Sequence, residues 1–169
     1  MAVGSLPAPD PARGGVCGSH DGSVVRLAVV TARWNDHLTS RLVDGARRAY
    51  EHCNIAAESV TEVWAPGSFE LPVVCKQLAA SGEFDAVIAI GVVVRGETTH
   101  YDLVSEAASV GVRAASLSTG VPVIFGVLTT ETEAQVVARA GDDDTNKGFE
   151  AVVTAVEMAT LLAKLPGAR

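Results

Sequence analysis

Apolar residues along the chain gather in four short runs, and segments with helical spacing separate one run from the next. The runs rich in valine, isoleucine and alanine span residues 24–31, 60–64, 86–94 and 121–127. Short apolar runs of this kind are typical of strands that are buried on both faces of a sheet. We therefore predict four strands, with the strongest pattern at 86–94 and the weakest at 60–64.

The first two segments between these runs carry the spacing of helices with one apolar face. Apolar side chains recur every three to four positions over residues 38–53, and Asn35 or Asp36 is expected to cap the start of this helix. Ser68 is expected to cap a second helix that runs to about Ala80.

Three further helices complete the pattern. A loop at 95–98 leads into a helix that ends at Gly120. The Thr-x-x-Glu sequence at 130–133 is a capping box before a short helix that stops at Gly141, and residues 147–163 form a last apolar helix. Strands that alternate with helices predict a three-layer α/β/α sandwich around a central four-stranded parallel sheet.

The first 23 residues differ from the rest of the chain in composition. They are rich in proline and glycine and show no apolar period, so we predict a flexible N-terminal arm at 1–23 and one α/β domain at 24–169. In parallel sheets of this kind ligands bind outside the carboxyl ends of the strands, so the residues that follow each strand are the candidates for a site.

Overall composition narrows the class of protein and its compartment. The 169 residues include 13 basic and 20 acidic side chains, and the net charge of −7 argues against a nucleic-acid partner. No run approaches the roughly 18 consecutive apolar residues of a membrane span, and the N-terminus lacks the pattern of a secretory signal. The three cysteines have neither metal-binding nor disulfide spacing, which favours reduced thiols and a cytoplasmic protein.

Two of the predicted strand ends carry residues suited to a planar ring and a polyol. Trp34 follows the first strand, where its indole offers a stacking surface or simply covers the edge of the core. Ser68, Phe69 and Glu70 follow Gly67 at the start of the second helix. The hydroxyl and the carboxylate suit either a grip on a polyol or plain helix capping, and spacing alone leaves both interpretations open.

The third strand is followed by the richest set of polar residues. Gly96 permits an unusual turn, and the amides of Glu97 and Thr98 are expected to open a helix, where an anion binds readily. His100 lies one turn further and is a candidate general acid or base, or else a structural histidine on a helix. No second histidine or cysteine stands nearby at metal-ligand spacing, so no metal site is predicted.

The last part of the chain holds weaker candidates. Phe125, taken as the end of the fourth strand, suits the core, and Arg139 suits either a phosphate or the solvated end of a helix. The acidic run at 142–144 is predicted to be a solvated loop, and Lys147 and Glu150 are expected to pair on a helix surface. The GxGxxG, GxxxxGK[ST] and GxSxG signatures of dinucleotide, nucleotide and hydrolase sites do not occur at the expected places.

Five segments of the chain, in order and at family-like spacing, resemble the lumazine synthases of riboflavin biosynthesis. The likeness runs from about Val25 to Leu162, and its longest segment is GVVVRGETTHYD at 91–102. The other segments are ARWN at 32–35, PGSFELP at 66–72, FGVLT at 125–129, and RAG with NKG at 139–141 and 146–148.

The resemblance implies a flavodoxin-like fold and a transferase that needs no cofactor. Its small-molecule substrates would be 5-amino-6-(D-ribitylamino)uracil and 3,4-dihydroxy-2-butanone 4-phosphate. Their condensation gives 6,7-dimethyl-8-ribityllumazine, phosphate and water, the penultimate step of riboflavin biosynthesis. The resemblance also implies a homopentamer with active sites between adjacent chains, and it allows riboflavin synthase as a partner protein.

Carried over residue by residue, the resemblance assigns proton transfer to His100. The residues that it assigns to substrate binding are Trp34, Ser68, Phe69, Glu70, Val92, Val93, Val94, Glu97, Thr98, Phe125 and Arg139. Of these, Phe125 and Arg139 are expected to reach the site from the neighbouring subunit, together with Lys147.

Three departures from the family pattern bear on function. Trp34 stands where many members have phenylalanine, and some fungal members with tryptophan there bind riboflavin, so flavin binding is an open alternative. The side chain of Glu97 would repel phosphate, so only its N–H is expected to help. The loop at 141–146 is not lengthened, which favours a 60-subunit shell of twelve pentamers, whereas its acidic run favours a single pentamer, and this choice stays open.

Two rival functions follow from the same residues. One is a flavin- or lumazine-binding protein of the same fold without synthase activity. The other is a receiver-like signalling domain, which needs an acidic pair after the first strand, where Asp36 is the near candidate.

Overall fold

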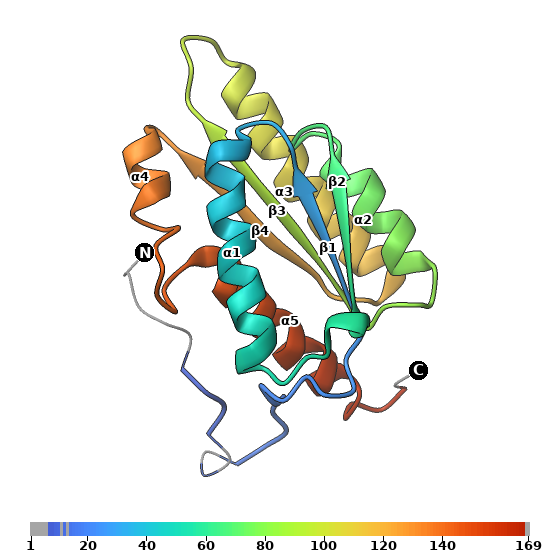
Figure 1. Ribbon diagram of the computed structural model, residues 1–169. Coiled ribbons are helices and arrows are strands. Elements are labelled where there is room, and N and C mark those ends of the chain that lie inside the picture. The colour runs from blue at the N-terminus through green and yellow to red at the C-terminus, as the bar shows by residue number, and fades with distance from the viewer. Residues whose placement is uncertain (1–6, 11, 13, 168–169) are drawn as a thin grey trace.

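The computed structural model describes residues 7–10, 12 and 14–167, and it places the four predicted strands in one parallel sheet (Figure 1). The order across the sheet is β2-β1-β3-β4. This is the start of the flavodoxin-like order, in which the chain first builds outward on one side of β1 and then on the other. The strands are β1 (Leu27–Ala32), β2 (Val60–Ala65), β3 (Ala86–Val94) and β4 (Val123–Thr130).

Helices cover both faces of the sheet, which confirms the predicted three-layer sandwich (Figure 1). A short 3-10 turn, η2 (Ala57–Ser59), precedes β2 and was not predicted. The helices are α1 (Asp36–His52), α2 (Leu71–Ala80), α3 (His100–Thr119), α4 (Glu133–Val137) and α5 (Lys147–Leu162). Helices α1 and α5 pack on one face of the sheet, and α2 and α3 pack on the other.

Two cores explain why the strand runs lack polar alternation. In β1, Leu27 and Val29 point to the core beneath α1 and α5, whereas Ala28 and Val30 point to the core beneath α2 and α3. Because successive side chains of a strand alternate between faces, a strand covered on both sides needs apolar residues at every position. The six residues of β1 are all buried.

The fourth strand lies later in the sequence than predicted. It begins at Val123 because Pro122, which has no N–H to donate to a ladder, precedes it. At its other end Thr129 and Thr130 continue the pairing with Val93 and Val94 of β3. Backbone pairing therefore extended the strand past its apolar residues.

Three predicted helix caps were wrong in detail. Asn35 is the N-cap residue of α1, but its side chain makes no capping bond. Helix α2 begins three residues after Ser68, with Glu70 as its N-cap residue and proline in the first turn as expected. The predicted box at 130–133 is displaced, since Thr132 caps α4 by accepting from the N–H of Gln135. Tertiary partners of Asn35 and Ser68, described below, explain the first two differences.

Part of the predicted arm lies against α5. The N–H of Ser19 donates to Oγ1 of Thr160 at 2.7 Å, and Nζ of Lys164 donates to the carbonyl of Cys17 at 2.8 Å. Residues 1–6, 11 and 13 of the arm, and 168–169 of the predicted domain, lie outside the described residues. The division at residue 23 therefore stays a prediction. None of the described helices combines the length and the apolar character needed to cross a bilayer.

Candidate functional site

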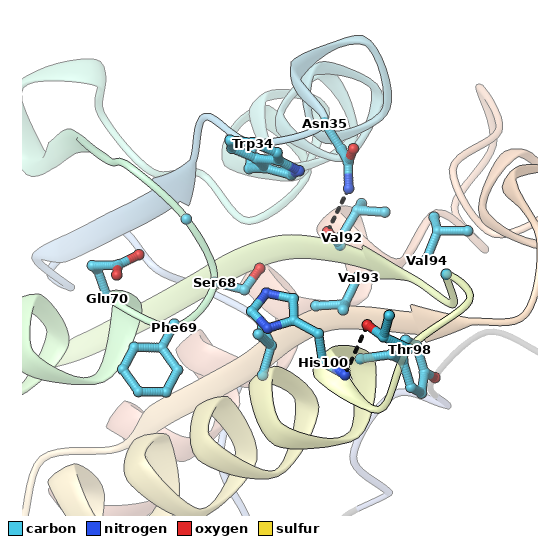
Figure 2. A pocket seen from close by; sticks show the side chains of 14 residues that line it. Trp34, Asn35, Ser68, Phe69, Glu70, Val92, Val93, Val94, Thr98 and His100 are labelled. Atoms are coloured by element: carbon cyan, nitrogen blue, oxygen red, sulfur yellow. Dashed lines mark hydrogen bonds between the residues drawn. The ribbon is translucent and has the colours of Figure 1, made fainter.

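A cavity of about 520 Å³ opens at the carboxyl ends of β1, β2 and β3 (Figure 2). It lies at the switch point between β1 and β3, where successive connections leave the sheet in opposite directions. Most of the predicted site residues line it, namely Trp34, Ser68, Phe69, Glu70, Val92, Val93, Val94, Thr98 and His100. The rule for parallel sheets thus led to a cavity at the carboxyl ends of the strands.

Trp34 stands on the loop after β1, and 74% of its surface is exposed. The backbone N–H of Trp34 donates to the carbonyl of Pro66 at 3.0 Å, and this bond joins the loop after β1 to the loop after β2. Figure 2 shows its indole across the cavity from His100. An exposed aromatic face above a pocket is suited to stacking on a planar ring, whereas a tryptophan that covered the core edge would be buried.

Asn35 also lines the cavity, although the sequence analysis did not assign it to the site. Its backbone is left-handed, with φ of 64°, and its Nδ2 donates to the carbonyl of Val92 at 3.0 Å across the switch point (Figure 2). The side chain is thus drawn to β3 and does not cap α1. The available signal was a lone asparagine after a strand, since asparagine tolerates a left-handed turn better than most residues other than glycine.

Ser68 forms part of the cavity wall next to Gly91 of β3. The side chain is only 6% exposed, and a Cβ on Gly91 would lie 2.6 Å from its Oγ. Because glycine has no side chain, Gly91 leaves room for the hydroxyl of Ser68. Phe69 is exposed beside it, and the N–H of Glu70 donates to the carbonyl of Gly67 in a tight turn at 3.3 Å.

The backbone of β3 continues past the end of β1. The register between the two strands ends at Thr31 and Ile90, whereas Val92, Val93 and Val94 extend beyond it along the cavity. On the other side these valines pair with β4. A strand edge that projects into a pocket presents peptide groups in a row, which suits hydrogen bonding to the edge of a planar heterocycle.

His100 begins α3, so the predicted helix start at Glu97 and Thr98 was wrong by two to three residues. Thr99 is the N-cap residue, and Oγ1 of Thr98 accepts from the N–H of His100 at 3.4 Å (Figure 2). The turn before the helix still lines the cavity through Gly96 and Thr98, but Glu97 does not. The imidazole and the Thr98 hydroxyl thus share one wall of the pocket.

Phe125 and Arg139 do not reach this cavity in their own chain. Phe125 is the third residue of β4, opposite Ala89, and not its last residue as predicted, and its side chain is partly exposed. Arg139 lies beyond the end of α4, where its NH1 donates to the carbonyl of Gln135 at 2.9 Å. Lys147 pairs with Glu150 as expected, Nζ to Oε2 at 2.5 Å.

The segment that carries Arg139 is attached to α1 by a buried asparagine. Asn146 is fully buried, and its Nδ2 donates to the carbonyls of Arg41 at 3.0 Å and Gly141 at 2.8 Å. The acidic run that precedes it is exposed, as predicted. Hydrogen bonds from Thr145 lower the pKa of Asp143 in this loop. Within the described residues, no group of three or more His, Cys, Asp or Glu side chains is arranged to hold a metal ion.

Comparison with known proteins gives a consistent result. A family model described as 6,7-dimethyl-8-ribityllumazine synthase matches residues 24–163. A protein of Thermococcus kodakarensis named 6,7-dimethyl-8-ribityllumazine synthase is 51% identical over 148 residues, which cover 88% of this chain and 93% of that protein. A protein of the same name from Thermococcus onnurineus is 50% identical over 148 residues, or 88% of this chain and 95% of that protein.

Proposed function

The chain belongs to the 6,7-dimethyl-8-ribityllumazine synthase family, a family of transferases in riboflavin biosynthesis, and we propose that the cavity beside Trp34 and His100 is its active site. The reaction condenses 5-amino-6-(D-ribitylamino)uracil with 3,4-dihydroxy-2-butanone 4-phosphate. It releases 6,7-dimethyl-8-ribityllumazine, phosphate and water. The family assignment removes the receiver-like signalling domain from consideration.

The pyrimidine substrate lies between the loop after β1 and the edge of β3. Its ring stacks on the indole of Trp34, and the peptide groups of 92–94 bind its polar edge. The ribityl chain then runs toward Ser68 and Glu70, with Phe69 beside it. The support is the geometry of the wall: an exposed aromatic face, a projecting strand edge and a hydroxyl next to a carboxylate line the same pocket.

The phosphorylated ketone occupies the wall formed by Gly96, Thr98 and the start of α3. The hydroxyl of Thr98 holds its phosphate, and the positive end of the α3 dipole favours the anion. His100 moves protons as the amine and ketone form an imine, phosphate leaves and the ring closes. Holding two reactants in one pose supplies up to about 7–11 kcal/mol in favourable cases, so positioning contributes more than His100.

The charge of this wall points to a second chain. Of the residues that the structure describes around the cavity, none is a lysine or an arginine. A bound phosphate with two negative charges calls for a cation, and we assign that role to Arg139 of an adjacent subunit. Phe125 and Lys147 of that subunit complete the site.

Helix α3 offers a surface for such self-association. Leu103, Val110 and Leu117 recur every seven residues on it and are 61%, 50% and 79% exposed. Aligned apolar residues at heptad spacing favour helix–helix packing. We propose a homopentamer, either alone or as twelve pentamers in a shell, with riboflavin synthase as a partner and the cytoplasm, which keeps its three free cysteines reduced, as the compartment.

The test is an assay of the purified chain with both substrates, read alongside the mass of the native particle. We expect the absorbance of 6,7-dimethyl-8-ribityllumazine to grow with time and phosphate to be released in equal amount. Binding of lumazine or riboflavin without turnover would overturn the enzyme assignment in favour of a binding protein. A native mass of one chain would overturn the shared site, and the same mass separates one pentamer from a shell.

A further inference from the structure

Arg95, which follows β3, lies at the centre of a group of charges beside the cavity. Its NH1 and NH2 donate to the two carboxylate oxygens of Asp102 at 3.3 and 3.1 Å, and its Nε donates to Glu131 at 3.0 Å. The backbone N–H of Arg95 donates to the carbonyl of Thr130 at 2.9 Å. Its guanidinium carbon lies 4.0 Å from the ring centroid of Tyr101.

These contacts join three parts of the chain around the wall assigned to the phosphorylated ketone. Arg95 precedes the turn at 96–99 and Asp102 follows it in the first turn of α3, so their bidentate ion pair closes this segment on itself. His100 lies within the closed segment. Tyr101, which the guanidinium contacts, lines the cavity together with Gly96.

The charge of Arg95 is already offset, which argues against a direct contact with phosphate. Two carboxylates surround one guanidinium, and all three of its nitrogens donate to them. Hydrogen bonds to Asp102, and then to Glu131, raise the pKa of Arg95. A bidentate arginine with a stacked aromatic ring has a defined orientation that a lysine does not reproduce.

We propose that Arg95 is a positioning residue, whose guanidinium holds the turn at 96–99 and the first turn of α3 in the geometry that receives the phosphorylated ketone. This inference rests on the proposed function of the cavity. It differs from the roles given to His100 and Thr98, because Arg95 acts through the segment that carries them. It predicts an effect on one substrate and not on the other.

The chain contains a matched control at the opposite end of the sheet. Arg26 donates from Nε and NH2 to the two carboxylate oxygens of Asp85 at 3.2 and 3.0 Å, and both side chains are partly exposed like those of Arg95 and Asp102. This pair lies at the amino ends of β1 and β3, far from the cavity. Exposed ion pairs of either kind contribute little to stability, so a difference in kinetics between the two variants reports on position.

The experiment compares R95A, R95K and R26A by steady-state kinetics, varying each substrate in turn, with thermal unfolding to verify the fold. For R95A we expect kcat/KM for the butanone phosphate to fall at least about tenfold, since small misplacements of reacting groups are costly, and KM for the pyrimidine to stay within about twofold. R95K should recover part of the loss. R26A should stay within about twofold in every constant.

Three results would overturn the inference: kinetic constants of R95A equal to wild type, equal effects on both substrates, or an equal loss in R26A. Should R95A fail to fold, D102N takes its place with the same expected split, and unchanged kinetics for D102N would reject the proposal. The wild-type reaction separates the two levels. If the unmodified chain forms no lumazine, the proposed function fails, whereas an active wild type with an unaffected R95A refutes the role of Arg95 alone.

Discussion

Each end of the sheet opens into a cavity, of about 520 Å³ at the carboxyl ends of the strands and about 590 Å³ at the amino ends. The first is lined by aromatic rings, hydroxyls, a carboxylate and an imidazole. The second is lined by apolar side chains, glycines, prolines and the Arg26–Asp85 pair, whose charges satisfy one another. Volume therefore does not distinguish the two ends, and the chemistry of the lining does.

The direction of the chain accounts for this difference. Because β1, β2 and β3 each lead into a helix, the first turns of α1, α2 and α3 lie at the carboxyl edge, where their N–H groups favour anions and polar ligands. The amino edge receives the last turns of those helices, whose free groups are carbonyls. A phosphorylated substrate is therefore expected at one edge only. Three experiments test that contrast, and a fourth tests the scaffold that both edges share.

Filling the wall beside Ser68 should have the largest effect. In Gly91→Val the new side chain collides with Oγ of Ser68 and Cδ1 of Leu71, which lie 2.6 and 3.2 Å from the position of a Cβ. We expect kcat/KM to fall by more than about 10²-fold, as reacting groups lose their alignment. The control is Gly126→Ala, where a Cβ also lies close to a neighbour, the carbonyl of Ala89 at 2.9 Å. Equal losses in both variants would point to general distortion of the sheet.

Removing the imidazole should cost less than blocking the pocket. We expect His100→Ala to lower kcat by about 10²-fold, at the lower end of the usual range for acid–base catalysis. The matched variant is His52→Ala at the other end of the molecule, where the imidazole packs against Phe149 in a tilted arrangement with ring centroids 5.2 Å apart. Single-turnover rates measure both. A loss above about 10⁴-fold in His100→Ala would contradict the view that positioning dominates.

Truncating the stacking surface should weaken one substrate. We expect Trp34→Ala to raise KM for the pyrimidine by up to about tenfold and Trp34→Phe to stay near wild type, since aromatic contacts contribute about 0.5–1.5 kcal/mol beyond burial. Fluorescence provides a second measurement. In Trp64→Phe, which leaves Trp34 as the emitter, titration with the pyrimidine or with riboflavin should quench emission, and constant emission with riboflavin would exclude flavin binding at this site.

Alkaline pH should destabilise the scaffold and leave the contrast between the edges unchanged. Burial raises the pKa of Cys75 from 9.0 to about 12 and that of Cys53 to about 11. The folded chain therefore keeps thiol protons that the unfolded chain loses above about pH 9. Its free energy of unfolding should decline from there by about 1.4 kcal/mol per pH unit for each thiol, up to about pH 11 for Cys53 and about pH 12 for Cys75. Denaturant titrations measure the decline, and Cys75→Ala should make it shallower.

The sequence predicted the elements well wherever packing alone defines them. The strand at 86–94 and the helix over 36–52 were predicted to within about two residues at each end. The strand is covered on both faces and is therefore a continuous apolar run, whereas the helix is covered on one face and shows the helical spacing of apolar residues. Errors occurred where a tertiary partner competes with a local one. Ser68 was expected as a cap and instead occupies the space left by Gly91, and Asn35 donates to Val92.

The sequence predicted which residues gather at one cavity, but it did not predict their geometry. Trp34, Ser68 and His100 follow strands, and parallel strands bring their ends to one edge, so their proximity could be inferred. Other features depend on contacts between segments that are far apart in the chain. They are the start of α3 at His100, the position of Phe125 within β4 and the ion pairs of Arg95. The spacing of residues along the sequence does not predict those contacts.

The sequence by itself determined the alternation of elements, the two-sided burial of the sheet and the edge at which chemistry gathers, because these follow from the period of apolar residues and from the direction of the chain. Only the tertiary structure decided which polar groups face the cavity and which satisfy one another. A polar side chain binds the partner that folding brings within about 3 Å, and that partner comes from another strand or helix.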